Sequence, residues 1–305
     1  MERHDCVQPA PLAGETVGIL AGWGRFPVAV AEAIRRHGGR TAILAIRDHA
    51  DAALEPLADA YGTVGVAEIG AAIAFFQAHG VRRATMAGKI HKAELFARRA
   101  WRRHLPDWVG LRTFWPHFVS RRRDNRDDSL LGAIAAAFDA RGVRVCPATD
   151  FAPELLAAEG LLAGRPLSAR ERADVEFGWH LAKEIGRLDV GQTVVVKNRA
   201  PLAVEAIEGT DACIRRAGAV CPSGGMVVVK VAKPRQDLRF DMPTIGVGTI
   251  ESLAAAGAAV LAVEAGRTIL VDQESLAACA RTRGIAIVSC SDAAGRPAFG
   301  DARAA

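Results

Sequence analysis

The sequence predicts an α/β protein of two domains, with a Rossmann-like parallel sheet in the N-terminal half and a mixed α/β domain in the C-terminal half. A length of 305 residues suggests one large or two medium domains. Short apolar runs alternate with amphipathic helical stretches, and a segment rich in proline and glycine separates the halves. We expect a flexible tail over 1–13, an N-terminal domain over 14–160, a linker over 161–168 and a C-terminal domain over 169–300.

The first half alternates strands with helices, as parallel sheets do. The run "TVGILAG" predicts a strand over 16–22, and the helix after it carries Pro27 in its first turn. Further strands are expected over 40–46 and 82–90, and further helices over 66–80 and 127–142. Ligands bind beyond the carboxyl ends of such strands. The pattern therefore places Gly22, Gly24, Gly88 and Lys89 at a common edge.

The second half opens with a predicted helix over 173–189 and continues with short strands. The predicted strands cover 193–198, 202–207, 226–232, 258–266, 268–272 and 285–290. Two short helices, over 210–218 and 249–257, separate some of them. This order indicates a second α/β domain.

The amino-acid composition limits the kinds of partner that the protein is expected to bind and the compartment in which it is expected to lie. The net charge of +5 favours an anionic partner, but a single tyrosine and the lack of zinc-finger or RNP-like patterns argue against nucleic acid. The six cysteines form no C-x-x-C pair, which is typical of a reducing compartment. No apolar run has the length of a signal peptide core or a membrane span, so we expect a cytoplasmic protein.

Two glycines after the first strand resemble part of a dinucleotide-binding fingerprint. Gly22 and Gly24 are present in "GWGRFP", but Pro27 occupies the third glycine position, and no acidic residue clearly ends the second strand. The turn could still present backbone amides to an anion. A nicotinamide-dependent oxidoreductase is therefore one open hypothesis, and a plain strand-to-helix turn is the alternative.

Two further segments carry charges next to predicted strands. In "EGTDA", Glu208 and Asp211 could bind a hard cation, or Thr210 could simply cap a helix that starts at Asp211. In "VVVKVAKPRQDLRFDMP", Lys230 and Lys233 precede Asp241. Cations beside a carboxylate are what phosphoryl transfer requires, although a surface network of ion pairs has the same composition.

The stretch from 98 to 126 holds nine arginines and only two aspartates. Trp101, Trp108 and Trp115 recur every seven residues, although Pro106 and Pro116 would interrupt a single helix. Aromatic and arginine side chains together suit an anionic membrane surface or single-stranded nucleic acid. An aromatic patch packed on the core, with a basic rim, remains the alternative.

Several long motifs resemble the LpxI-type UDP-2,3-diacylglucosamine pyrophosphatases of lipid A biosynthesis. The motifs are "AGWGRFP", "GKI", "RDDSLLGAI", "AKEIGRLDVGQTVVV", "LAVEAIEGTDACIRRAG", "VVVKVAKPRQDLRFDMPTIGVGTIE" and "VLAVEAGRTILVD". The resemblance implies a Mg²⁺-dependent hydrolase that converts the acylated UDP-sugar to UMP and 2,3-diacylglucosamine 1-phosphate (lipid X). It also implies a ligand cleft between two domains and a homodimer. The chain departs from the family in "IHKAEL" after "GK" and in its arginine-rich stretch.

The resemblance also implies roles for individual residues. The critical aspartate of the family corresponds to Asp241, which would bind the metal or orient water. We expect Asp211 and Lys233 to share in catalysis, and Glu208 and Asp211 to join Asp241 at the metal. Gly22, Gly24, Lys89, Thr210 and Lys230 are expected to contact substrate. The alternative is a non-catalytic protein that binds an acylated or nucleotide sugar at the inner membrane surface.

Overall fold

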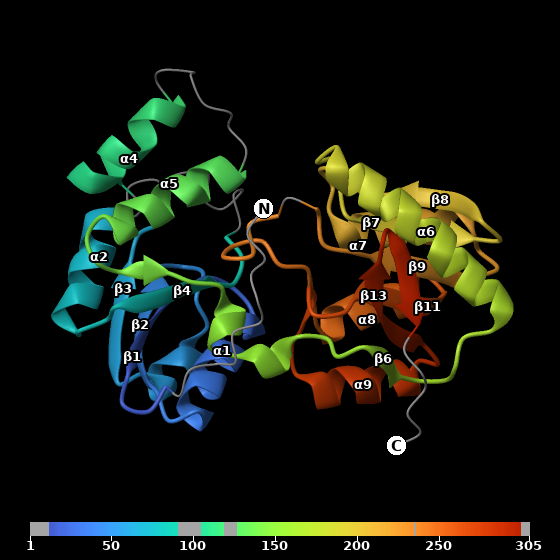
Figure 1. Ribbon diagram of the computed structural model, residues 1–305, viewed down its shortest axis with the longest axis horizontal. Coiled ribbons are helices and arrows are strands. Elements are labelled where there is room, and N and C mark those ends of the chain that lie inside the picture. Colours follow the sequence, from blue (N-terminus) through green and yellow to red (C-terminus); the bar gives the residue numbers. More distant parts are fainter. Residues whose placement is uncertain (1–11, 91–104, 119–126, 235, 300–305) are drawn as a thin grey trace. The chain divides into compact units, whose positions relative to one another are not determined.

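The computed structural model describes residues 12–90, 105–118, 127–234 and 236–299. By its internal contacts the chain forms two units (Figure 1). One comprises Met1–Pro153 with Asp237–Asp241, and the other Glu154–Gln236 with Met242–Ala305. Most of the expected tail lies outside the described residues, but Leu12 is buried, so the N-terminal unit begins before residue 14.

The N-terminal unit contains a five-stranded parallel sheet, as predicted, in the order β3-β2-β1-β4-β5. Its strands are β1 (Thr16–Ala21), β2 (Arg40–Ile46), β3 (Ala60–Val64), β4 (Arg83–Ala87) and β5 (Arg144–Val145). Its α-helices are α1 (Arg25–Arg36), α2 (Ile69–Ala78), α4 (Trp108–Phe118) and α5 (Asp127–Asp139). Helices α2 and α5 share one apolar cluster with the sheet, built around Phe76 and Phe138.

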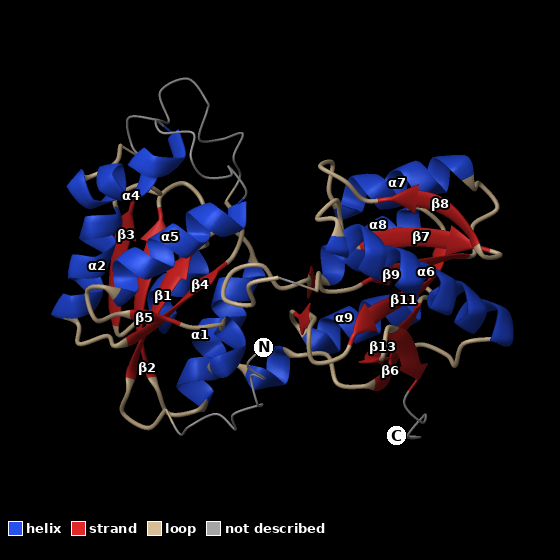
Figure 2. Ribbon diagram, turned by 45° about the horizontal axis from the view of Figure 1, so that its top comes forward, coloured by secondary structure: helices blue, strands red, loops and turns tan. Residues whose placement is uncertain are grey.

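The C-terminal unit contains a mixed sheet in the order β14-β13-β11-β9-β7-β8, with β6 also paired to β13 (Figure 2). Its strands are β6 (Gly160–Ala163), β7 (Thr193–Lys197), β8 (Ala200–Val204), β9 (Met226–Lys230), β11 (Ala258–Glu264), β13 (Ala286–Ala293) and β14 (Arg296–Phe299). Strands β10 (Thr244–Ile245) and β12 (Ile269–Leu270) form a separate pair. Helix α6 (Ala169–Arg187) packs in one core cluster, and α7 (Thr210–Val220), α8 (Val247–Ala255) and α9 (Gln273–Thr282) pack in another.

The predicted linker over 161–168 is not where the units divide. The division falls after Pro153, and most of β6 lies inside the expected linker. Strand β6 pairs antiparallel with β13, and a Cβ atom on Gly164 would lie 2.7 Å from the Ile285 carbonyl oxygen. The glycine therefore permits a close packing contact beside an edge strand. The sequence pattern marked this turn correctly but did not show that it belongs to the sheet.

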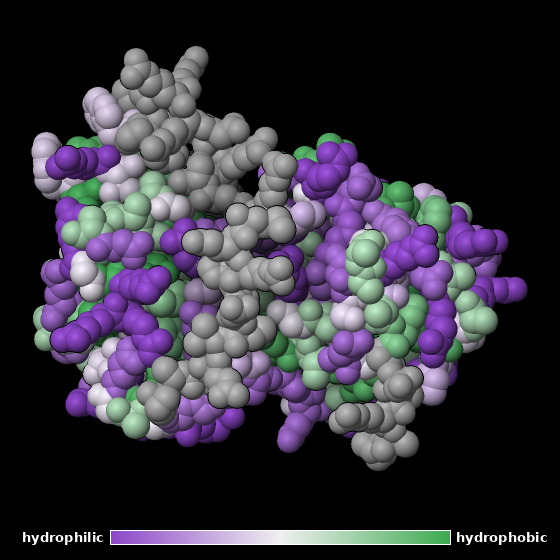
Figure 3. Space-filling model, in the orientation of Figure 1, coloured by the Kyte–Doolittle hydropathy of each residue, from purple (hydrophilic) through white to green (hydrophobic). Residues whose placement is uncertain are grey.

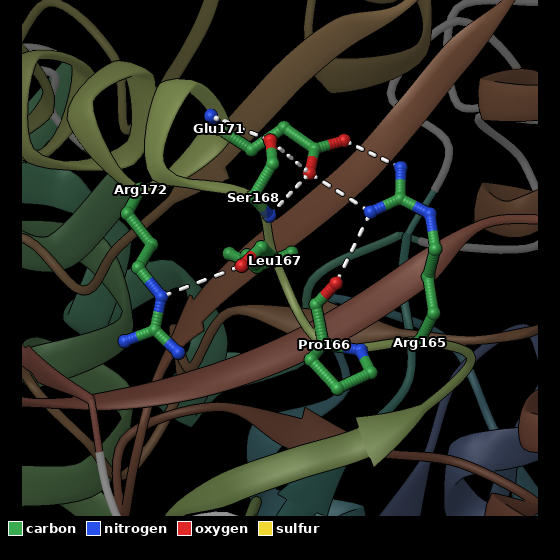
Figure 4. Close-up of polar contacts among 6 residues, drawn as sticks. All are labelled: Arg165, Pro166, Leu167, Ser168, Glu171 and Arg172. Carbon is green, nitrogen blue, oxygen red and sulfur yellow. Dashed lines mark hydrogen bonds and ion pairs between the residues drawn. The ribbon is translucent and has the colours of Figure 1, made fainter.

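Helix α6 begins with a capping box that an arginine extends (Figure 4). The Ser168 hydroxyl accepts the Glu171 backbone N–H, and the Glu171 carboxylate accepts the Ser168 N–H at 2.8 Å. Arg165 donates two further hydrogen bonds to the same carboxylate, at 2.6 and 2.8 Å. The hydrogen bonds from Arg165 are the main reason that the pKa of Glu171 falls from 4.5 to about 2.

Replacing Glu171 by Ala should lower the free energy of unfolding by about 1–2 kcal/mol at neutral pH, because the cap and the ion pair are lost together. A depressed pKa stabilises the fold above the unfolded-state value of 4.5, and this stabilisation is lost as the pH falls toward about 2. Chemical denaturation at neutral pH and at about pH 3 measures the loss of unfolding free energy and its decrease in acid. The exposed Glu176→Ala is the control in the same helix. If the Glu171→Ala variant lost as much unfolding free energy at acid pH as at neutral pH, the ionised Glu171 carboxylate would not be the source of the stabilisation.

Candidate functional site

One edge of the C-terminal sheet brings together two segments that lie apart in the sequence. Strand β9 ends at Lys230, which is paired with Thr193 at the start of the antiparallel β7. Strand β8 runs antiparallel to β7 and ends at Val204, so "EGTDA" leaves the sheet at this same edge. Lys230 and this segment therefore lie at the same sheet edge within the unit.

The polar groups at this edge contact one another. Glu205 is buried, and its carboxylate accepts hydrogen bonds from the Thr210 hydroxyl at 2.9 Å and the Gln192 backbone N–H at 3.3 Å. The hydroxyls of Thr210 and Thr193 lie 3.4 Å apart. Thr210 is the first residue of α7 and Gly209 is its N-cap, so the predicted capping role of Thr210 is wrong. Thr210 instead orients the buried Glu205 carboxylate.

The two lysines of "VVVKVAKPRQDLRFDMP" have different environments. Lys230 is buried at the end of β9, and its ammonium lies 3.5 Å from the Thr244 carbonyl oxygen. Lys233 is partly exposed and pairs with Asp189 at 2.8 Å. Because a buried ammonium interacts strongly with anions, Lys230 is the better placed of the two to neutralise a phosphate. Lys233 must share its charge with Asp189.

The Glu264 carboxylate, which the sequence analysis did not single out, fixes the start of the loop after β9. Glu264 ends β11 with only 3% of its surface exposed. It accepts the Ala232 backbone N–H and the Lys183 ammonium, both at 2.8 Å. Lys183 also pairs with Asp292 at 3.1 Å and lies over the Trp179 ring. A glutamate that closes an otherwise apolar strand is the sequence signal that could have identified it.

The loop after Gln236 crosses to the N-terminal unit, where Asp237–Asp241 makes its contacts. The Phe240 ring packs against the apolar cluster of that unit. Arg239 forms a two-point ion pair with Asp237, and its guanidinium lies 4.8 Å from the Phe240 ring centre. The opposite charges of this loop therefore largely neutralise each other before Asp241.

Asp241 is half-buried and follows this paired group directly. Its backbone N–H donates to the Asp237 carbonyl at 3.2 Å. Within the described residues, its carboxylate makes no hydrogen bond or ion pair, unlike that of Asp237. A carboxylate that is partly withdrawn from water and uncommitted to another side chain is suited to bind a cation or a water molecule.

Of the expected metal set, Asp241 belongs to the N-terminal unit, and Asp211 and Glu208 belong to the C-terminal unit. No group of three or more His, Cys, Asp or Glu side chains in the described ranges is arranged to hold a metal ion. The Glu208 carboxylate accepts the Ala206 N–H and pairs with Arg216 at 2.5 Å. Hydrogen bonds from its own backbone N–H, from Arg216 and from Ala206 lower the pKa of Glu208. Asp211 is exposed in the first turn of that helix.

The glycine motif of the N-terminal unit has a structural explanation. Trp23 and Lys89 exchange two backbone hydrogen bonds, with N···O distances of 2.8 and 2.9 Å, so the turns after β1 and β4 are joined. A Cβ atom on Gly22 would lie 2.7 Å from the Lys89 carbonyl oxygen. Gly24 has a φ of 106°, which favours glycine, and is the N-cap of α1.

This arrangement disfavours the oxidoreductase hypothesis. In dinucleotide-binding folds the pyrophosphate lies in the crevice between the first strand and its neighbour at the switch in strand order. Here the order changes between β1 and β4, where the backbones of Trp23 and Lys89 pair directly. Gly22 thus serves backbone packing, whereas a Cβ atom on Gly24 would have no neighbour within 4 Å and the Lys89 side chain is exposed.

Comparisons with known proteins cover both units. A family model described as the LpxI N-terminal domain matches residues 16–155, and one described as the LpxI C-terminal domain matches residues 158–288. A protein of Caulobacter vibrioides, named UDP-2,3-diacylglucosamine pyrophosphatase LpxI, is 34% identical over 282 residues, which are 89% of this chain and 96% of that protein. The boundary between the two matched ranges lies close to the division after Pro153.

Replacing Phe240 by Ala should loosen the segment that carries Asp241, because the ring is its apolar contact with the N-terminal core. We expect amide hydrogen exchange over 237–241 to become about tenfold faster or more, with the strands of both sheets unaffected. Phe240→Leu keeps most of the apolar surface and is the matched control. Unchanged exchange in the alanine variant would show that the ring does not hold the segment.

Proposed function

Since the chain belongs to the LpxI family over residues 16–155 and 158–288, we propose that it hydrolyses the pyrophosphate bond of UDP-2,3-diacylglucosamine in lipid A biosynthesis. One water molecule is consumed, and the products are UMP and 2,3-diacylglucosamine 1-phosphate. The observation that carries the proposal is the match to the Caulobacter protein, which extends over 96% of that relative.

The C-terminal unit supplies groups that suit a pyrophosphate. Breaking the bond between the phosphates places additional negative charge on the leaving oxygen, which a fixed cation stabilises. The buried ammonium of Lys230 is such a cation, and the N-terminus of α7 opens at the same sheet edge, behind Gly209. We propose that both contact the phosphates, with Thr210 holding Glu205 in place beside them.

Asp241 is the carboxylate that we propose acts on water or on a metal ion. Its lack of a protein partner in the described segments leaves both oxygens available as acceptors. A carboxylate that is available in this way can orient a water molecule and accept its proton as the water attacks phosphorus. Asp237 lies in the same loop but is occupied by Arg239, so it cannot replace Asp241 in this role.

Mg²⁺ is part of this proposal on the family resemblance. Proteins often hold Mg²⁺ through only one or two carboxylates, with substrate phosphates and water completing the shell. The donor chemistry of Asp241, and of the exposed Asp211, fits this mode, whereas Glu208 is bound to Arg216. When bound, the ion would neutralise charge on the phosphate oxygens. We also propose a homodimer, which sedimentation analysis would test.

Purified protein given UDP-2,3-diacylglucosamine and Mg²⁺ should release UMP and the acylated sugar phosphate in equal amounts, as measured by mass spectrometry. A chelator should abolish the release, and excess Mg²⁺ should restore it. The alternative is that the protein binds the acylated sugar and does not hydrolyse it. Bound substrate that stays intact under every metal condition would favour that alternative over hydrolysis.

Replacing Asp241 by Asn should lower kcat by about 100-fold or more, because the amide neither accepts a proton nor binds Mg²⁺ well. The thermal unfolding midpoint should change little, since no hydrogen bond to the carboxylate is lost within the described residues. Glu251→Gln, on the exposed face of α8, makes the same chemical change elsewhere and should keep full activity. Full activity in the Asp241 variant would remove this residue from the mechanism.

A further inference from the structure

Helix α4 is held on the N-terminal unit by one face. Val109 and Phe114 pack against the apolar cluster of that unit, and Gly110 leaves no room for a Cβ atom. The Asp107 carboxylate accepts the Gly110 N–H at 2.7 Å and the Ala71 N–H at 2.9 Å, which ties the start of α4 to α2. These contacts fix which side of the helix faces outward.

The opposite face is apolar and exposed to solvent. The exposed fractions are 78% for Trp108, 41% for Leu111 and 56% for Trp115. Their spacing of three and four residues places them on one side of the helix, and the exposed Arg112 lies beside Trp108. Figure 1 shows α4 at the outside of the N-terminal unit, next to α2 and α5. Two large aromatic side chains at such exposure on one helix face indicate an interaction surface.

Positive charge is concentrated in the part of the sequence that contains and flanks this helix. Residues 98–126 carry nine arginines and two aspartates, a net charge of +7, whereas the entire 305-residue chain has +5. The rest of the protein is therefore slightly acidic. Of the two aspartates, Asp107 is already hydrogen-bonded to backbone amides. The partner of the exposed face should consequently be anionic.

We propose that the outer face of α4, formed by Trp108, Leu111, Arg112 and Trp115, binds the surface of an anionic lipid bilayer. Indole rings favour the membrane–water interface, and the exposed Arg112 would pair with phosphate headgroups. A second copy of the chain is a poorer occupant, because a two-fold contact would bring two segments of +7 together. Leu111 between the two indoles suits acyl chains better than nucleic-acid bases.

The inference goes beyond the proposed reaction and is tested without measuring it. The full chain is mixed with vesicles of phosphatidylcholine alone, or of phosphatidylcholine with phosphatidylglycerol, and floated through a density gradient. We expect flotation with the anionic vesicles, loss of flotation at high salt and a blue shift of tryptophan emission on binding. No flotation with anionic vesicles at low salt would overturn the proposal, whether or not the protein hydrolyses its substrate.

Variants assign the binding to α4. Trp108→Ser with Trp115→Ser should weaken vesicle binding by about tenfold or more, and Arg112→Gln by about fivefold at low salt. The control is Val220→Ser, which removes an exposed apolar side chain from the other unit and should bind normally. Circular dichroism checks that each variant is folded. Folded tryptophan variants that float like the unaltered protein would overturn the proposal. So would variants that lose only self-association or only binding to single-stranded RNA.

Discussion

The path of the loop after β9 depends on the hydrogen bond that the buried Glu264 carboxylate accepts from the Ala232 backbone. A charged group with 3% exposure is tolerated only when its oxygens are satisfied, and here the Ala232 amide and the Lys183 ammonium satisfy them. Ala232 is the second residue after the end of β9. The direction in which the chain leaves the sheet is therefore fixed by an acceptor on the neighbouring strand. Removing that acceptor would leave Lys183 to Asp292 alone, in a largely buried place.

The loop is fixed again at its far end by a different kind of force. Glu264 holds its start by hydrogen bonds in the C-terminal unit, while Phe240 holds its end by apolar packing in the N-terminal unit. The Asp237–Arg239 ion pair shortens the free length between these points. Asp241 follows directly after the second anchor. Its position within the N-terminal unit is thus set by a residue that need not touch the substrate, and a change at Phe240 would displace it.

Much of the fold could be predicted because local periodicity decides it. Alternating apolar runs and helices predicted both sheets. The short strands β6 and β14 were harder to predict, because each has only four residues and β13 is the strand with which each pairs. The helix α9 was missed because its apolar residues are mostly alanines, which give a weak pattern.

The side-chain environment of the site could not be predicted, because it depends on contacts between distant residues. Glu208 and Asp211 have the same charge and lie three residues apart. Glu208 nevertheless forms an ion pair with Arg216, whereas Asp211 is exposed. Lys230 and Lys233 differ in the same way, since one is buried and the other pairs with Asp189. A charge pattern states which ions a site could attract. Burial and pairing then decide how each of those charges can act, as the buried Lys230 and the ion-paired Lys233 show.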